Sequence, residues 1–205
     1  MIKLTKITQQ KLLIGEGKAE EVFFGELINI LNLNNEILIT SYGGKDNLSN
    51  FLETLPLIPG FDELKSLGIT RYADNSIHSA FQSVNSILNK HKLPMPKSLD
   101  NLIAKNNHIK ISLFFLPDNK NSGMLEDLLL NSIENDSIID CIDSYFECVK
   151  NQTGKQPKNM AKAKIHAWLA SQKNPDKSLI DATKARYWDY NNFAFYNLQQ
   201  FILSL

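Results

Sequence analysis

Residues 109–116 read IKISLFFL, and this stretch decides the fold class. Its apolar side chains fall on both faces of an extended chain, which is typical of a central parallel strand covered by helices on both sides. Shorter apolar runs precede it at residues 11–15, 36–42 and 67–73. Helical spacing follows each of those runs, over residues 18–33, 46–55 and 77–90. Strands that alternate with helices predict an α/β fold with a mainly parallel sheet of about four strands.

Residues 92–107, which precede the strongest strand, are rich in Pro and Asn and are predicted to be irregular. After that strand, which ends at Leu116, the alternation of strands and helices stops. Only helices are predicted there, over residues 124–134, 137–149, 162–172 and 193–205. We therefore expect one domain over residues 1–205, with an α/β core at 10–135 and a helical C-terminal extension at 136–205 packed on it.

The composition is that of an ordinary soluble protein, with 22 basic and 22 acidic residues among 205 and a hydrophobic fraction of 43%. These values exclude a disordered chain and a uniformly basic nucleic-acid coat. Charge is nevertheless segregated: residues 116–149 hold eight acids and one lysine, whereas residues 150–186 hold nine bases and two acids. Either the two faces neutralise each other across a helix pair, or an acidic metal-binding edge lies beside a basic phosphate-binding surface.

Nothing in the sequence suggests a membrane protein. No run of about 18 apolar residues exists, and residues 1–10 lack the apolar centre of a signal peptide, so we expect a cytoplasmic protein. A disulfide is not expected in that compartment. Cys141 and Cys148, seven residues apart, are predicted to be small buried side chains.

Acidic side chains follow the predicted strands. Glu16 comes after the first strand, Asp74 after the third and Asp118 after the fourth, and Glu126 and Asp127 begin the next helix. Parallel strands end at one edge of a sheet, so several of these carboxylates are expected to converge. Such oxygen ligands suit Mg²⁺ or Mn²⁺. Each acid also has a structural interpretation, as a helix cap, a turn former or a first-turn residue stabilised by the helix dipole.

Basic and aromatic residues suggest a polyanionic ligand. Lys45 follows the Gly43-Gly44 pair after the second strand, which is either a plain turn or a phosphate cradle. The basic stretch would hold nucleic-acid backbone through Lys155, Lys158, Lys162, Lys164 and Lys173. Seven aromatic residues between 187 and 201 are expected to pack the last helix against the core, the alternative being stacking on bases.

Several motifs in this order resemble a known fold. They are KLLIGEGKAEEVFF (11–24), SYGGKDNL (41–48), RYADNS (71–76) and FFLPDNKNSGMLEDLLL (114–130). The strand-end motifs resemble the Rossmann-like TOPRIM fold of topoisomerases, primases and OLD-type nucleases. With KAKIHAWLASQ (162–172) and the tail RYWDYNNFAFYNLQQFILSL (186–205), residues 10–205 look like a stand-alone TOPRIM-like family of unknown function.

The resemblance implies roles for particular residues. Glu16 would act as general acid/base or metal ligand, and Asp74 corresponds to the second Asp of an Asp-x-Asp motif. Glu126 and Asp127 would complete a cation site.

A late lysine, Lys162 or Lys164, would neutralise a phosphate. The sequence departs from the pattern at Tyr72, which stands where the first Asp is expected. A phenol with a pKa near 10 is a poor substitute for a carboxylate ligand.

Three functions follow as hypotheses. The first is a Mg²⁺- or Mn²⁺-dependent nuclease with a role in antiphage defence. The second is a catalytically degenerate TOPRIM-fold module that binds nucleic acid or regulates a partner such as an ATPase. The third is an unrelated small-molecule enzyme, against which the absence of GxGxxG, P-loop and GxSxG motifs counts.

Overall fold

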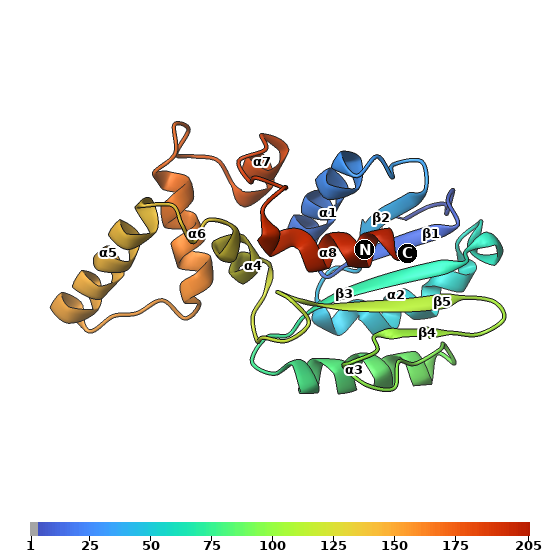
Figure 1. Ribbon diagram of the computed structural model, residues 1–205. Helices are drawn as coiled ribbons and strands as arrows, with labels where there is room; N and C mark the ends of the chain where they lie inside the picture. Colours follow the sequence, from blue (N-terminus) through green and yellow to red (C-terminus); the bar gives the residue numbers. More distant parts are fainter. Residues whose placement is uncertain (1–3) are drawn as a thin grey trace.

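A five-stranded sheet of order β2-β1-β3-β5-β4 forms the centre of the computed structural model, which describes residues 4–205 (Figure 1). Four strands run parallel: β1 (Lys11–Gly15), β2 (Ile37–Ser41), β3 (Ser66–Tyr72) and β5 (Lys110–Leu116). The predicted α/β class and mainly parallel sheet are therefore confirmed.

The fifth strand, β4 (Ile103–Lys105), lies antiparallel to β5 at one edge of the sheet. It falls within residues 92–107, so the prediction of an irregular segment there was wrong at this point. A strand of only three residues is too short to show an apolar pattern of its own. Pairing with β5, in which Ile103 lies opposite Ser112, is what makes this segment a strand.

Neighbouring residues of β5 serve two different cores. Phe114 packs against Phe201, with ring centroids 5.3 Å apart, while Phe115 packs against Phe81, with centroids 6.2 Å apart. Phe201 belongs to α8 (Tyr196–Leu203) and Phe81 to α3 (Ile77–Lys90). The apolar run of residues 109–116 is thus buried on both faces, as a strand in this position requires.

Helices complete both layers (Figure 1). On the face of Phe114, α1 (Lys18–Ile30) joins α8 in one apolar cluster. On the face of Phe115, α2 (Leu48–Thr54) joins α3 in the other.

The C-terminal part consists of helices that share the first of these clusters. They are α4 (Leu125–Ser132), α5 (Ile138–Thr153), α6 (Met160–Ala170) and α7 (Leu179–Lys184), followed by α8. The six-residue α7 was not predicted, because it is too short to show helical periodicity. It contacts α1 and so brings the extension onto the core. Trp168 of α6 stacks on Trp188, with centroids 4.9 Å apart, in the same cluster.

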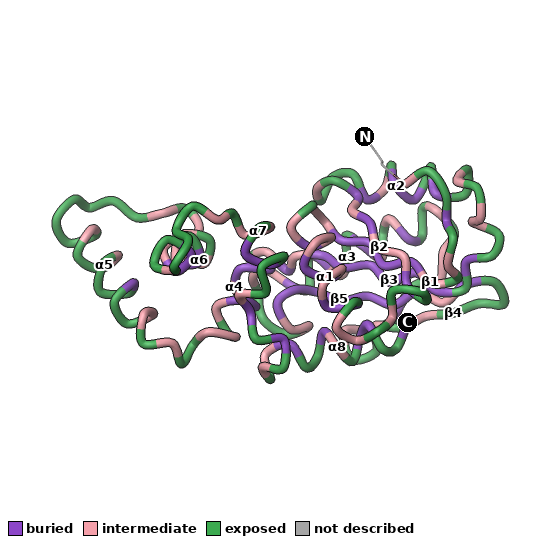
Figure 2. The backbone as a smooth tube through the Cα atoms, turned by 90° about the horizontal axis from the view of Figure 1, so that it is seen from above, coloured by how far each residue is buried: buried purple, intermediate pink, exposed green. Residues whose placement is uncertain are grey.

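Helix α5 projects away from the sheet together with α6 (Figures 1 and 2). Ile142 is its one buried residue. Cys141 and Cys148 are both exposed, so the prediction that they are buried was wrong. Their seven-residue spacing does place them on one face, but that face is the outer face of a projecting helix.

Two ion pairs join the basic stretch to the acidic one. Lys164 Nζ lies 2.5 Å from Asp143 Oδ1, and Lys162 Nζ lies 3.6 Å from Glu126 Oε1. The segregated charges are therefore partly neutralised between α6 and its neighbours. None of the helices described between residues 4 and 205 has the length and apolarity needed to cross a bilayer.

Candidate functional site at the carboxyl edge of the sheet

Glu16 directly follows β1 and forms an ion pair with the end of β3. Its Oε2 accepts hydrogen bonds from Arg71 Nη1 at 2.5 Å and from the backbone N–H of Tyr72 at 3.3 Å. The side chains of Glu16 and Arg71 are only 12% and 10% exposed, respectively. The acid predicted to be catalytic is therefore held against a buried guanidinium.

The same guanidinium reaches Asp74. Arg71 Nη2 lies 3.8 Å from Asp74 Oδ2, and Lys45 Nζ lies 3.9 Å from the same oxygen. Asp74 has a φ of +49° and exchanges two backbone hydrogen bonds with Gly123, at 3.0 and 2.8 Å. Asp tolerates this left-handed conformation better than most residues. The structure thus brings Glu16 and Asp74 to one place, with Arg71 between them.

Two other predicted ligands serve local structure. Asp127 Oδ2 accepts the backbone N–H of Met124 at 2.8 Å and so caps α4. Asp118 Oδ1 accepts the backbone N–H groups of Lys120 and Asn121, at 3.0 and 2.8 Å, in the turn after β5. Each carboxylate takes the structural role that its sequence position also allowed.

Glu126 is buried at the start of α4. Its Oε1 faces Lys162, as described above, and its Oε2 has no hydrogen-bond partner among the described residues. Lys162, one of the two lysines expected to neutralise a phosphate, here lies beside a carboxylate.

Glu20, in the first turn of α1, is a member of this site that sequence reasoning missed. It is 1% exposed, its Oε2 accepts the N–H of Gly17 at 3.2 Å, and its Oε1 has no partner within residues 4–205. Burial raises the pKa of Glu20, the neighbouring Tyr72 hydroxyl opposes this shift, and the negative charges of Glu16 and Glu126 add to it. Its position three residues after Gly17 indicated a helix cap, but no sequence signal indicated its burial.

Tyr72 lies beside Glu20. Burial raises the pKa of the Tyr72 phenol, and the charge of Glu20 raises it further. The side chain that stands where the resemblance expects a carboxylate is therefore a neutral phenol at physiological pH.

The five predicted metal ligands do not form one set. Among residues 4–205, no group of three or more His, Cys, Asp or Glu side chains is arranged to hold a metal ion. Arg71 occupies the space between the two acids that do converge, Glu16 and Asp74. As arranged, this donor set does not fit a single divalent ion.

A groove of about 510 Å³, which we call the strand-end groove, opens beside Asp74. Lys45 and Lys158 line it from opposite segments, and Met160 and Ala161 line it at the start of α6. The first N–H groups of a helix have no partner within the helix, so this end of α6 offers donors to an anion. Two lysines and a helix N-terminus therefore face the groove together with the carboxylates of Asp74 and Asp127.

The other predicted phosphate-binding lysines lie outside this groove. Lys164 is in its ion pair with Asp143, and Lys155 is exposed on the connection between α5 and α6. Arg71, which is central to the site, was not predicted. It lies within β3, in a mainly apolar run that predicts a buried strand rather than a site residue.

Comparison with curated proteins and with solved structures found no match. The model of one protein family does match, over residues 10–205, which include every element from β1 to α8 and all the site residues described above. The chain belongs to the family described as "Protein of unknown function (DUF3226)".

Proposed function

We propose that this protein is a nucleic-acid-binding module built on a TOPRIM-like site that has lost its metal. The observation that carries the proposal is the Arg71 guanidinium between Glu16 and Asp74. An arginine side chain stays protonated at any physiological pH. It supplies the positive charge that these acids need and repels a divalent cation from the same position.

Tyr72 supports this proposal independently. At the position where the resemblance expects a ligand, the chain has a buried phenol whose pKa is raised, so it contributes no negative charge. With one carboxylate fewer than the resemblance implies, and with a guanidinium beside Glu16 and Asp74, the site should attract a divalent cation less strongly.

The strand-end groove provides the binding surface. Lys45 and Lys158 are exposed and can each meet one backbone phosphate, while the first turn of α6 donates N–H groups to a third. Asp74 and Asp127 border the groove and keep its net charge low. We therefore expect moderate affinity with a marked dependence on salt.

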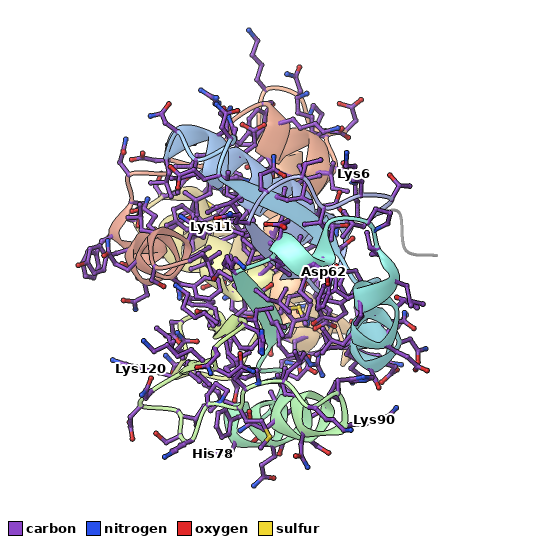
Figure 3. The ribbon with its side chains drawn as sticks, turned by 90° about the vertical axis from the view of Figure 1, so that its right-hand side faces the viewer. Lys6, Lys11, Asp62, His78, Lys90 and Lys120 are labelled. Atoms are coloured by element: carbon purple, nitrogen blue, oxygen red, sulfur yellow. The ribbon has the colours of Figure 1, made fainter. Side chains whose placement is uncertain are left out.

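The test is fluorescence anisotropy with labelled 20-nucleotide DNA and RNA, single-stranded and duplex, in EDTA. The variant Lys45→Gln/Lys158→Gln is compared with Lys6→Gln/Lys65→Gln. The control lysines precede β1 and β3, at the amino-terminal edge of the sheet onto which Figure 3 looks.

We expect binding without metal, at least about tenfold weaker in the groove variant and unchanged in the control. The slope of log Kd against log salt should fall by about one for each lysine that no longer binds a phosphate. Equal affinity in both variants, or binding only with added Mg²⁺, would overturn the proposal.

A second candidate is Mg²⁺- or Mn²⁺-dependent phosphoryl transfer, which the resemblance associates with the OLD-type nucleases of phage defence. Glu20 Oε1 and Glu126 Oε2 favour it, because both are buried acceptors without a partner in the described chain, and the charges of Glu16 and Glu126 both act on Glu20. A bound divalent ion would polarise a phosphate and activate water.

Calorimetric titration of Mn²⁺, with plasmid, single-stranded DNA and tRNA as substrates, separates the two candidates. Cleavage that requires metal and disappears in Glu16→Gln would establish the enzyme.

A further inference from the structure

The C-terminal tail keeps two of its aromatic rings out of the core. Phe193 is 83% exposed and Tyr196 is 48% exposed, whereas Phe195, between them in sequence, is fully buried. The two exposed rings stack on each other, with centroids 5.6 Å apart and planes at 9°. Together they present a flat aromatic surface at the start of α8, which we call the aromatic pair.

The surface next to the aromatic pair combines amide, charged and apolar side chains. A hollow of about 420 Å³ continues along α8, where Asn197 and Gln200 of that helix face Asn119 and Lys120 of the turn after β5. Asp100 and Asp118 also line it, and its floor is apolar, formed by side chains such as Leu102 and Phe201. Lys120 projects into solvent on the side of the molecule where α8 lies (Figure 3). The amides and the two carboxylates can hydrogen-bond the edges of a base that lies on the flat rings, and Lys120 can meet its phosphate, so this surface suits an unpaired nucleotide.

One loop connects this hollow to the strand-end groove. The segment 117–124 contributes Asn119 and Lys120 to the hollow, and Gly123 and Met124 to the groove. A polynucleotide held by its phosphates in the groove can therefore cross this loop and reach the aromatic pair.

We infer that the aromatic pair is a stacking platform for unpaired bases, so that the ligand of this protein is single-stranded nucleic acid. The inference rests on the proposed function and names its ligand class. Bases in a duplex are stacked on their own neighbours, and only an unpaired base can lay its face on an aromatic side chain.

The test compares a 20-nucleotide single strand with the duplex of the same sequence, for Phe193→Ala/Tyr196→Ala and for the control Leu57→Ala/Tyr145→Ala. The control removes an equally exposed pair of apolar side chains, from the segment after α2 and from α5. Circular dichroism checks that each variant is folded. A 2-aminopurine base in the single strand reports stacking through quenching of its fluorescence.

We expect the single strand to bind about tenfold or more weakly to the aromatic variant and to lose its 2-aminopurine quenching. Duplex affinity and the control should not change, and Phe193→Tyr/Tyr196→Phe should bind as the wild type does. An unchanged single-strand affinity, or an equal loss for strand and duplex, would overturn the inference.

The lysine variant separates this inference from the proposed function. If Lys45→Gln/Lys158→Gln weakens binding while the aromatic variant does not, the groove binds nucleic acid and the platform is wrong. If the wild type binds neither strand nor duplex, both are wrong. Self-association that disappears in the aromatic variant, measured by sedimentation, would instead assign the pair to contact with a second copy of the chain.

Discussion

Arg71 Nη1 lies 2.5 Å from Glu16 Oε2, joining the ends of two neighbouring parallel strands. A buried carboxylate is stable in its charged form only with a partner of opposite charge or several hydrogen bonds. Glu16 has both, because the N–H of Tyr72 donates to the same oxygen. The ion pair therefore links the ends of β1 and β3 and also places charged groups at the candidate site.

Replacing Arg71 should expose this dependence. Arg71→Gln leaves Glu16 buried without its cation, and we expect the free energy of unfolding to fall by about 3 kcal/mol. Glu16→Gln/Arg71→Gln removes both charges and should recover most of that loss. Urea unfolding of the two variants measures the difference. Equal stability of single and double variants would mean that the ion pair contributes little.

Glu20 should make stability depend on pH. Its pKa is raised by burial, so the folded protein keeps the proton to higher pH than the unfolded chain does. The free energy of unfolding should then fall as pH rises from the ordinary value of 4.5 towards the folded pKa, and level off above it.

Glu20→Gln preserves an oxygen that can accept the N–H of Gly17 but carries no titrating proton. Urea unfolding between pH 4 and 8 in EDTA should show a smaller decline in this variant than in the wild type. Parallel curves for the two proteins would contradict the raised pKa.

The parts of the fold that sequence patterns predicted are those with a period of their own. Strand β1 was predicted at its observed bounds, and so was helix α3, because each carries its pattern within one segment. Strand β4 and helix α7 depend on partners far away in the sequence, namely β5 and α1. Short segments of this kind have no local pattern that distinguishes them from loops.

In the candidate site, too, some features could be predicted from local sequence and others could not. The rule that parallel strands end at one edge was enough to bring Glu16 and Asp74 together in the prediction. That Arg71 forms ion pairs with both acids depends on its side-chain rotamer. The burial of Glu20 depends on how α1 packs. Both are properties of three-dimensional packing that residue types and spacing do not contain.

Asp136 and Trp168 provide a pH-sensitive contact outside the site. Trp168 Nε1 donates to Asp136 Oδ2 at 2.8 Å, and this hydrogen bond, with one from the N–H of Ile138, lowers the pKa of Asp136. The stabilisation is therefore complete above the ordinary pKa of 3.8 and is lost as pH falls through the lowered value. Because the carboxylate is near the surface, we expect a contribution of no more than about 1 kcal/mol.

The indole N–H resonance of Trp168 measures this contact directly. It should shift as pH falls from 6 to 2, and the shift should disappear in Asp136→Ala. The indole of Trp188, which donates to Thr183 at 3.2 Å, is an internal reference. A Trp168 resonance that moves identically in both proteins would rule out the assigned hydrogen bond.

Substitution of two glycines with positive φ, Gly60 and Gly154, distinguishes the cost of backbone strain from the cost of steric overlap. Gly60 has a φ of +94°, and a Cβ there would lie 2.1 Å from the carbonyl oxygen of Ile7, whose N–H donates to Pro59. Gly154 has a φ of +68°, and a Cβ there would meet nothing within 4 Å. Gly154→Ala should therefore lower the free energy of unfolding by about 1 kcal/mol, the cost of the left-handed conformation alone. Gly60→Ala must also displace the segment that contains Ile7 from its place beside the sheet, and should lose at least about 2 kcal/mol more. Thermal and urea unfolding of the two variants test this order, and similar losses would show that the segment before β1 yields without cost.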